Sequence, residues 1–118
     1  MKLNISQTQA ETTEGCFGSD KATNYTLIIR LDASPSETAS IQKQKLDDKY
    51  LTKFTVEYAK DIERMIWISD ILNKDGSYIF RSLSLLQRVE REVTEACKGL
   101  KNTIDADENF GGSKSIDL

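Results

Sequence analysis

Hydrophobic positions repeat most regularly in the C-terminal third of the chain. They follow one another at steps of three and four residues over about five turns, the spacing that aligns side chains along one face of an α-helix. The positions are Leu86, Val89, Val93, Cys97, Leu100 and Ile104. Ser84 followed by Gln87 is a capping-box pattern, so we expect this helix to begin there and to end near Asp107.

Other side chains of this helix lead to three expectations. Gly99 weakens a helix by about 1 kcal/mol against alanine and would let another backbone approach closely. Cys97 belongs to the apolar stripe, so we expect a buried small hydrophobic side chain. Pairs four residues apart on the outer side add surface support. These pairs are Arg88 with Glu92 and Arg91 with Glu95.

Alternation of apolar and polar residues predicts the strands. Asn24–Leu31 and Tyr50–Tyr58 alternate most clearly, and Lys2–Gln9 alternates more weakly. Between the first two strands of the chain, Ala10–Thr23 contains glycines and many small polar residues. This composition predicts a loop or the wide end of a hairpin, with Cys16 inside it as a free thiol.

The segment Lys60–Asn73 fits either a helix or a strand. As a helix it would align apolar residues on one face, whereas Met65–Ser69 is rich in the β-branched and aromatic residues that favour extension. We favour the strand, because Asn73–Gly76 can then form a hairpin turn to a return strand at Ser77–Ser82.

A short helix is predicted after the second strand. Ser34 can cap it, the following proline suits its first position, and Glu37 completes a capping box. We expect this helix over Pro35–Lys45. At the other end of the chain, residues 110–112 predict a turn, and Ser113–Leu118 would add a last edge strand.

These elements predict one α+β domain over residues 1–118. We expect a mostly antiparallel sheet of about five to six strands, with the long C-terminal helix packed on one face and one short helix beside it. The other face of the sheet would be covered by the short helix, by a partner subunit or by a ligand.

The composition excludes several kinds of chemistry. The 118 residues contain no histidine and two cysteines, which rules out imidazole catalysis and a four-ligand zinc site. A net charge of −3 argues against nucleic acid as a partner. No apolar run approaches the ~20 residues that cross a bilayer, and Met1–Ala10 alternates like a strand rather than a signal peptide. We therefore expect a cytoplasmic protein without a membrane partner or cofactor.

Acidic and basic clusters are weak candidates for a site. Asp105–Asn109 matches the first ligand positions of a calcium loop, but Phe110 replaces its glycine and Ile116 its last ligand. We favour an acidic helix exit there and a polar turn at Asn73–Gly76. Candidate catalytic carboxylates, none of which the sequence selects, are Asp32, Glu57, Asp61, Glu63 and Asp70. Lysines that we interpret as exposed rather than as a phosphate patch are Lys43, Lys45, Lys49 and Lys53.

Aromatic side chains supply the remaining candidates. On one face of the sheet they would be core, and on both faces they would line an interface or a pocket. The interface or ligand-binding candidates are Tyr25, Phe54, Tyr58, Trp67 and Tyr78. With no catalytic motif, we predict a non-enzymatic, soluble interaction protein that forms a homodimer through the open sheet face or an edge strand, or that binds another protein. The alternative is a small-molecule-binding domain with an aromatic pocket between sheet and helices; an enzyme using carboxylates or tyrosine ranks last.

Overall fold

The computed structural model describes residues 1–14, 20–110 and 117. Within these residues it contains five strands, a long C-terminal helix and shorter helices, so the predicted α+β class is confirmed. In chain order the elements are β1 (Lys2–Glu14), β2 (Asp20–Asp32), α1 (Pro35–Lys43), the 3-10 turn η2 (Leu46–Asp48), β3 (Tyr50–Val56), β4 (Ala59–Trp67), α2 (Ile68–Ile71), β5 (Gly76–Phe80) and α3 (Leu83–Phe110).

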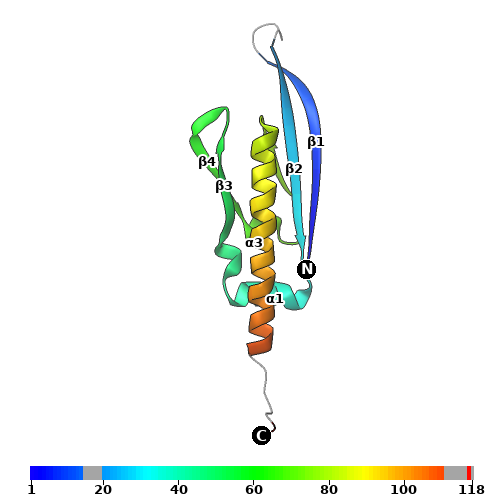
Figure 1. Cartoon of the computed structure of the whole chain (residues 1–118), viewed down its shortest axis with the longest axis vertical. Coiled ribbons are helices and arrows are strands. Elements are labelled where there is room, and N and C mark those ends of the chain that lie inside the picture. Colours follow the sequence, from blue (N-terminus) through cyan, green and yellow to red (C-terminus); the bar gives the residue numbers. More distant parts are fainter. Residues whose placement is uncertain (15–19, 111–116, 118) are drawn as a thin grey trace.

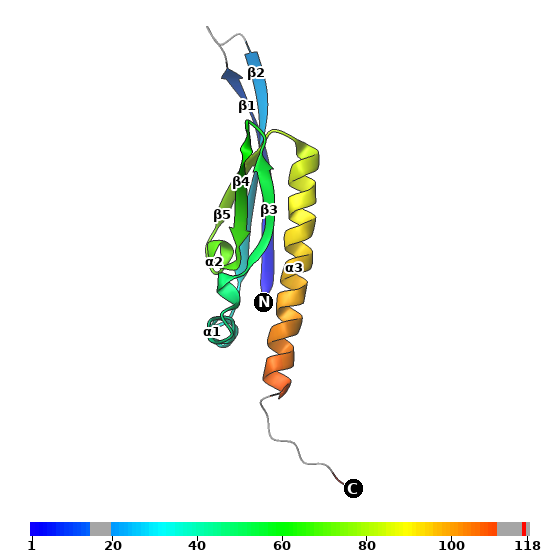
Figure 2. The same ribbon diagram turned by 90° about the vertical axis from the view of Figure 1, so that its left-hand side faces the viewer.

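The strands form two antiparallel sheets on one side of α3. One sheet has the order β1-β2-β5, and the other is the hairpin β3-β4. In Figure 1, α3 lies between the β1–β2 hairpin and the β3–β4 hairpin. Figure 2 shows both hairpins on the same side of α3, so the helix forms a second layer over the strands.

The core lies between α3 and the strands of both sheets. In β2, Leu27, Ile29 and Leu31 point towards the helix and are at most 1% exposed. Tyr78 and Phe80 of β5 join them, because Tyr78 pairs with Leu27 in the sheet. All six residues of the predicted apolar stripe are buried, which confirms the face by which α3 packs.

Of the two alternatives for Ala10–Thr23, the loop is wrong where the structure describes the segment, and the described residues belong to the β1–β2 hairpin. β1 continues to Glu14 and β2 begins at Asp20, and the two pair without interruption in one antiparallel register. Threonine-rich sequence suits a strand, and the ladder of main-chain hydrogen bonds outweighs the small polar composition that suggested a loop. Cys16 and both glycines of this segment lie outside the described residues.

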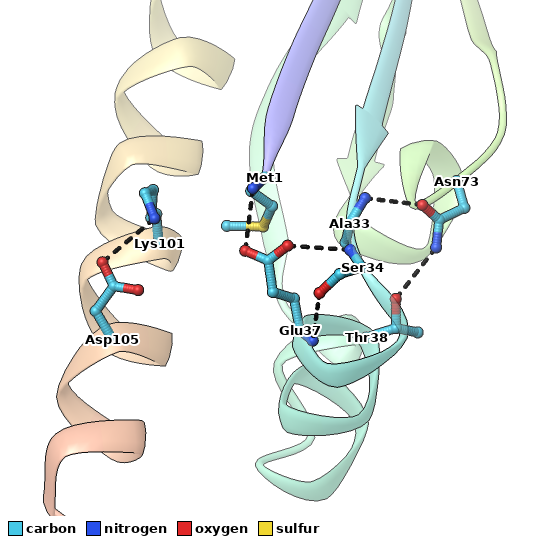
Figure 3. A network of polar contacts seen from close by, with 8 residues as sticks. All are labelled: Met1, Ala33, Ser34, Glu37, Thr38, Asn73, Lys101 and Asp105. Atoms are coloured by element: carbon cyan, nitrogen blue, oxygen red, sulfur yellow. Dashed lines mark hydrogen bonds and ion pairs between the residues drawn. The ribbon is translucent and has the colours of Figure 1, made fainter.

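The predicted hairpin turn at Asn73–Gly76 is also wrong. β4 ends at Trp67, the short helix α2 follows, and β5 pairs with β2 instead of β4. Two hydrogen bonds link Asn73 to the end of β2. Its backbone N–H donates to the carbonyl of Leu31 at 2.8 Å, and its side-chain oxygen accepts from the N–H of Ala33 at 2.9 Å. Its amide also donates to Thr38 in α1 (Figure 3). Long-range bonds therefore decide the partner of β5.

The helix starts agree only in part with the capping patterns. The capping box of Ser34 and Glu37 is present. α1 ends at Lys43 and not at Lys45 as predicted, and the backbone of Lys45 is left-handed with φ 56°. α3 begins at Leu83, and the hydroxyl that accepts from a backbone N–H of its first turn is that of Ser82 rather than Ser84: the donor is the N–H of Leu85.

The outer side of α3 differs from prediction at two places. A Cβ built on Gly99 would meet no atom of another described segment within 4 Å, so no backbone among the described residues approaches it closely. Glu95 pairs with Lys98 at 3.2 Å rather than with Arg91, whereas the predicted pair of Arg88 and Glu92 is present. α3 continues through residue 110, where we predicted a turn. The predicted strand at 113–118 falls almost entirely outside the described residues, in which only residue 117 is placed.

Candidate functional site: two open strand edges beside α3

The predicted aromatic residues do not form one site. Phe54 and Tyr78 are 4% and 2% exposed and belong to the core, where the ring of Phe54 lies 4.8 Å from that of Phe80. Tyr58 is 77% exposed, beyond the end of β3 at Val56. Trp67 and Tyr25 are half-buried in different parts of the fold. Core packing thus uses two of the five candidates and separates the rest.

Tyr78 has an environment that suppresses its ionisation. Burial raises the pKa of Tyr78 to about 12, and the nearby carboxylate of Asp70 contributes in the same direction. The guanidinium of Arg64 lies 4.7 Å from the centre of its ring and acts in the opposite direction. Tyr78 is therefore a neutral core side chain near pH 7 and not a general base.

The first open edge belongs to β1. Its thirteen residues pair with β2 in a regular register without a bulge, and β2 is its only partner strand among the described residues. Every residue from Ser6 to Thr13 is exposed. The other edge of β1 is therefore free to form a ladder with a further strand.

An apolar groove lies between β1 and α3 next to this edge. It encloses about 200 Å³. Its lining residues are Met1, Leu3, Leu31, Thr94, Cys97, Lys98 and Lys101. Figure 3 shows Met1 beside the helix that carries Lys101, whose ammonium pairs with Asp105 at 3.4 Å. Both lysines are thus in ion pairs within α3, and the groove offers mainly apolar surface.

Cys97 contributes surface to this groove rather than reactivity. The side chain is a free thiol, as expected, and is 6% exposed. Burial raises the pKa of Cys97 to about 11, which keeps the thiol protonated near neutral pH. The prediction of a buried small hydrophobic side chain is confirmed.

The second open edge belongs to β3 and forms one wall of a larger groove. This groove encloses about 460 Å³ and is lined by six successive residues of β3, from Tyr50 to Thr55, and by Glu63, Arg88 and Glu92. Successive side chains of a strand point to opposite faces, so a hollow over one face would be lined by alternate residues. Lining by successive residues shows that the groove runs along β3 beside α3.

Polar contacts join the two walls of the β3 groove. The hydroxyl of Thr52 in β3 donates to the carboxylate of Glu92 in α3, which also accepts from Arg88 at 2.9 Å. The hydrogen bond from Thr52 is the main cause that lowers the pKa of Glu92, and Arg88 adds to it. Glu92 is therefore a charged, internally bonded residue in the wall.

A neighbouring hollow extends this groove towards the start of α3. It encloses about 310 Å³ and shares Thr55 and Arg88 with the first. Its other lining residues are Glu57, Lys60 and Leu85. The two hollows together follow β3 along its length beside α3.

The candidate carboxylates do not converge on a catalytic centre. Glu63 lies 3.9 Å from Lys53, and Asp70 accepts from the backbone N–H of Trp67. Asp32 pairs with Arg30 at 2.7 Å. Asp105–Asn109 is part of the helix α3 and not a loop. In the part of the chain that the structure describes, no three side chains of the types that hold metals come together.

The sequence contained little sign of the two edges. Alternation shows which side chains share a face, but it does not show which edge of a strand stays unpaired. One signal was present, since Leu3–Ala10 carries no charge and no proline, the residues that usually protect an edge.

The comparisons with known proteins supply no family. No family model matches the chain, and no curated protein or solved structure is significantly similar to it. Among the described helices, none is long and apolar enough to cross a membrane. The functional argument therefore depends on the geometry of the two edges.

Proposed function

We propose that this protein is a non-enzymatic interaction protein that self-associates by pairing the β1 edges of two copies. The observation that carries the proposal is the open edge of β1, which is thirteen residues long, free of bulges, and without a charge or proline from Leu3 to Ala10. Natural proteins protect long edges with charges, prolines or bulges, and an edge without them is a template for another strand. Pairing two such edges gives one continuous antiparallel sheet.

Charge supports a second copy as the occupant of this edge. Lys2 lies at one end of β1 and Glu11 near the other, and neither has an ion-pair partner among the described residues. In an antiparallel pair related by a two-fold axis, each contact occurs twice. The basic end of β1 in each copy then lies near the acidic end of β1 in the other, and the uncharged centres of the two strands pair with each other.

The alternative, a small-molecule-binding domain, has weaker support. The apolar groove beside β1 encloses about 200 Å³, whereas ligand pockets usually enclose about 300–1,000 Å³. Phe54 and Tyr78, which we expected to line a pocket, are core residues. A second copy that extends the sheet past β1 would instead cover this groove.

We also propose that this protein is located in the cytoplasm. Cys97 is a free and buried thiol. A reducing compartment preserves such thiols, because glutathione and thioredoxin keep them from oxidation.

Sedimentation velocity over a concentration series tests the proposal. Ser6→Lys puts a charge in the middle of the β1 edge, and we expect it to weaken the dimer at least about tenfold, or about 1.4 kcal/mol. The matched control is Asn102→Lys, on the exposed side of α3, which changes the net charge equally. A wild-type protein that stays monomeric at about 1 mM, or two variants with the same effect, would contradict the proposal.

A further inference from the structure

We infer that the far end of the β1–β2 hairpin in one copy of the chain covers the apolar groove between β1 and α3 in the second copy, where Glu11 of the hairpin pairs with Lys98. The inference rests on the proposed self-association through β1. It adds the register of the two strands and the residues that meet across them.

The β1–β2 hairpin extends beyond the start of α3 (Figures 1 and 2). α3 begins at Leu83, which lines a hollow together with Gln9 of β1. The strand pairs that follow, from Glu11 with Thr23 onwards, therefore lie past the first turn of the helix. Residues 11–13 of β1 are exposed. A two-stranded ribbon by itself is only marginally stable, so a second layer would stabilise this end of the hairpin.

The apolar groove lies at the opposite end of the same strand. Leu3 of β1 and Cys97 of α3 line it, whereas Gln7 donates a hydrogen bond to Glu90, nearer the start of the helix. β1 and α3 thus run in opposite directions. Each chain therefore has a hairpin end that lacks a helix and, at the other end of β1, a groove that lacks a cover among the described residues.

An antiparallel pair of β1 strands brings these two ends together. The two-fold axis reverses the second strand, so the hairpin end of one copy lies beside the groove of the other. A register centred on Gln7 pairs the uncharged residues 4–10 with one another and places Glu11 opposite Leu3 of the second copy. Opposite residues share a face of the sheet, and every second residue of β1 points towards the helix, so Glu11 faces the groove.

Charge supports this register. None of the ion pairs within the described residues includes Glu11. Lys98 at the groove pairs with Glu95 at 3.2 Å, but the two side chains are 68% and 66% exposed, and such exposed pairs contribute little to stability. The ammonium of Lys98 can therefore donate to a second carboxylate. The methylene groups of Glu11 and the methyl group of Thr13 then cover the apolar surface.

A charge swap tests this contact in the full chain by sedimentation velocity. We expect Glu11→Lys and Lys98→Glu each to weaken the dimer at least about fivefold, since each contact occurs twice in a two-fold pair. The double variant should return to within about twofold of the wild type. The matched control combines Glu11→Lys with Lys60→Glu, at an exposed lysine of β4; it has the same net charge and should not restore the dimer.

Carbodiimide cross-linking of a mixture of isotope-labelled and unlabelled wild-type protein tests the same contact without a substitution. The reagent joins a carboxylate directly to an amine that touches it, and we expect a link between Glu11 of one copy and Lys98 of the other. Additive losses in the double variant, or a dimer without this link, would overturn the inference and leave the proposed self-association standing. A wild-type protein that stays monomeric at about 1 mM would overturn both.

Discussion

The carboxylate of Glu57 accepts a hydrogen bond from the backbone N–H of Ser82 at 2.9 Å, across 25 residues of sequence. The same oxygen accepts from the backbone N–H of Arg81. Glu57 follows β3, and Ser82 precedes the first turn of α3. A negative charge at the start of a helix is favourable because the helix dipole is positive there. Glu57 thus joins the β3–β4 hairpin to the helix that forms the other wall of the groove.

Removal of the Glu57 carboxylate should weaken the attachment of the β3–β4 hairpin to the start of α3. We expect Glu57→Ala to lower the free energy of unfolding by about 1–2 kcal/mol, since hydrogen bonds to a charged group are lost and two amides lose their partner. Urea denaturation measures the change. Asp61→Ala, an exposed carboxylate on the same hairpin, is the control and should cost less than about 0.5 kcal/mol. Equal losses in both variants would show that Glu57 does not anchor α3.

Two glycines should respond in opposite directions to alanine. Gly99 has open space where a Cβ would lie, so Gly99→Ala should stabilise the protein by about 1 kcal/mol through helix propensity. At Gly76 a Cβ would lie 2.8 Å from a methyl of Ile71 and 2.8 Å from the hydroxyl of Tyr78, so Gly76→Ala should destabilise it by about 1–3 kcal/mol. Thermal unfolding of both variants checks the signs, and a destabilising Gly99→Ala would mean that this face of α3 is covered.

Asn73 should tolerate glycine better than alanine. Its backbone is left-handed, with φ 57°, and its side chain bonds to Ala33 and Thr38. Asn73→Gly loses only the side-chain bonds, at about 1 kcal/mol, whereas Asn73→Ala adds the strain of a left-handed backbone and should cost about 2–3 kcal/mol. Denaturant unfolding separates the two, and equal losses would mean that the side-chain bonds alone matter.

The buried thiol of Cys97 should make stability fall in alkaline solution. Its pKa is raised from 9.0 to about 11 in the folded protein, so between these values the unfolded chain ionises while the folded chain keeps its proton. Stability is then complete below pH 9 and should decline by up to about 1.4 kcal/mol per pH unit towards pH 11. Cys97→Ala should have a flatter stability profile from pH 8 to 10 than the parent. Parallel profiles would contradict burial of the thiol.

Local periodicity was enough to predict α3 and the central part of β2. The spacing of Val89, Val93 and Cys97 depends only on the helical repeat, and the alternation of Leu27 with Ile29 depends only on the pleat of a strand. The helical pattern also predicted which side chains of α3 are buried, because the helix packs through one face.

Pairing between distant segments could not be predicted in the same way. Asn73–Gly76 has the composition of a hairpin turn, yet bonds from Asn73 to Leu31 and Ala33 direct β5 onto β2. The β1–β2 hairpin continues through residues of loop-like composition because each strand supplies main-chain partners for the other.

The sequence by itself determined the α+β class, the buried stripe of α3 and the absence of imidazole chemistry, because these follow from residue type and local spacing. The tertiary structure alone decided that Phe54 and Tyr78 are core and that, among the described strands, β1 and β3 each keep one unpaired edge. The reason is physical: alternation sets the face of a strand, whereas its hydrogen-bonding partner is chosen by contacts between segments far apart in the chain.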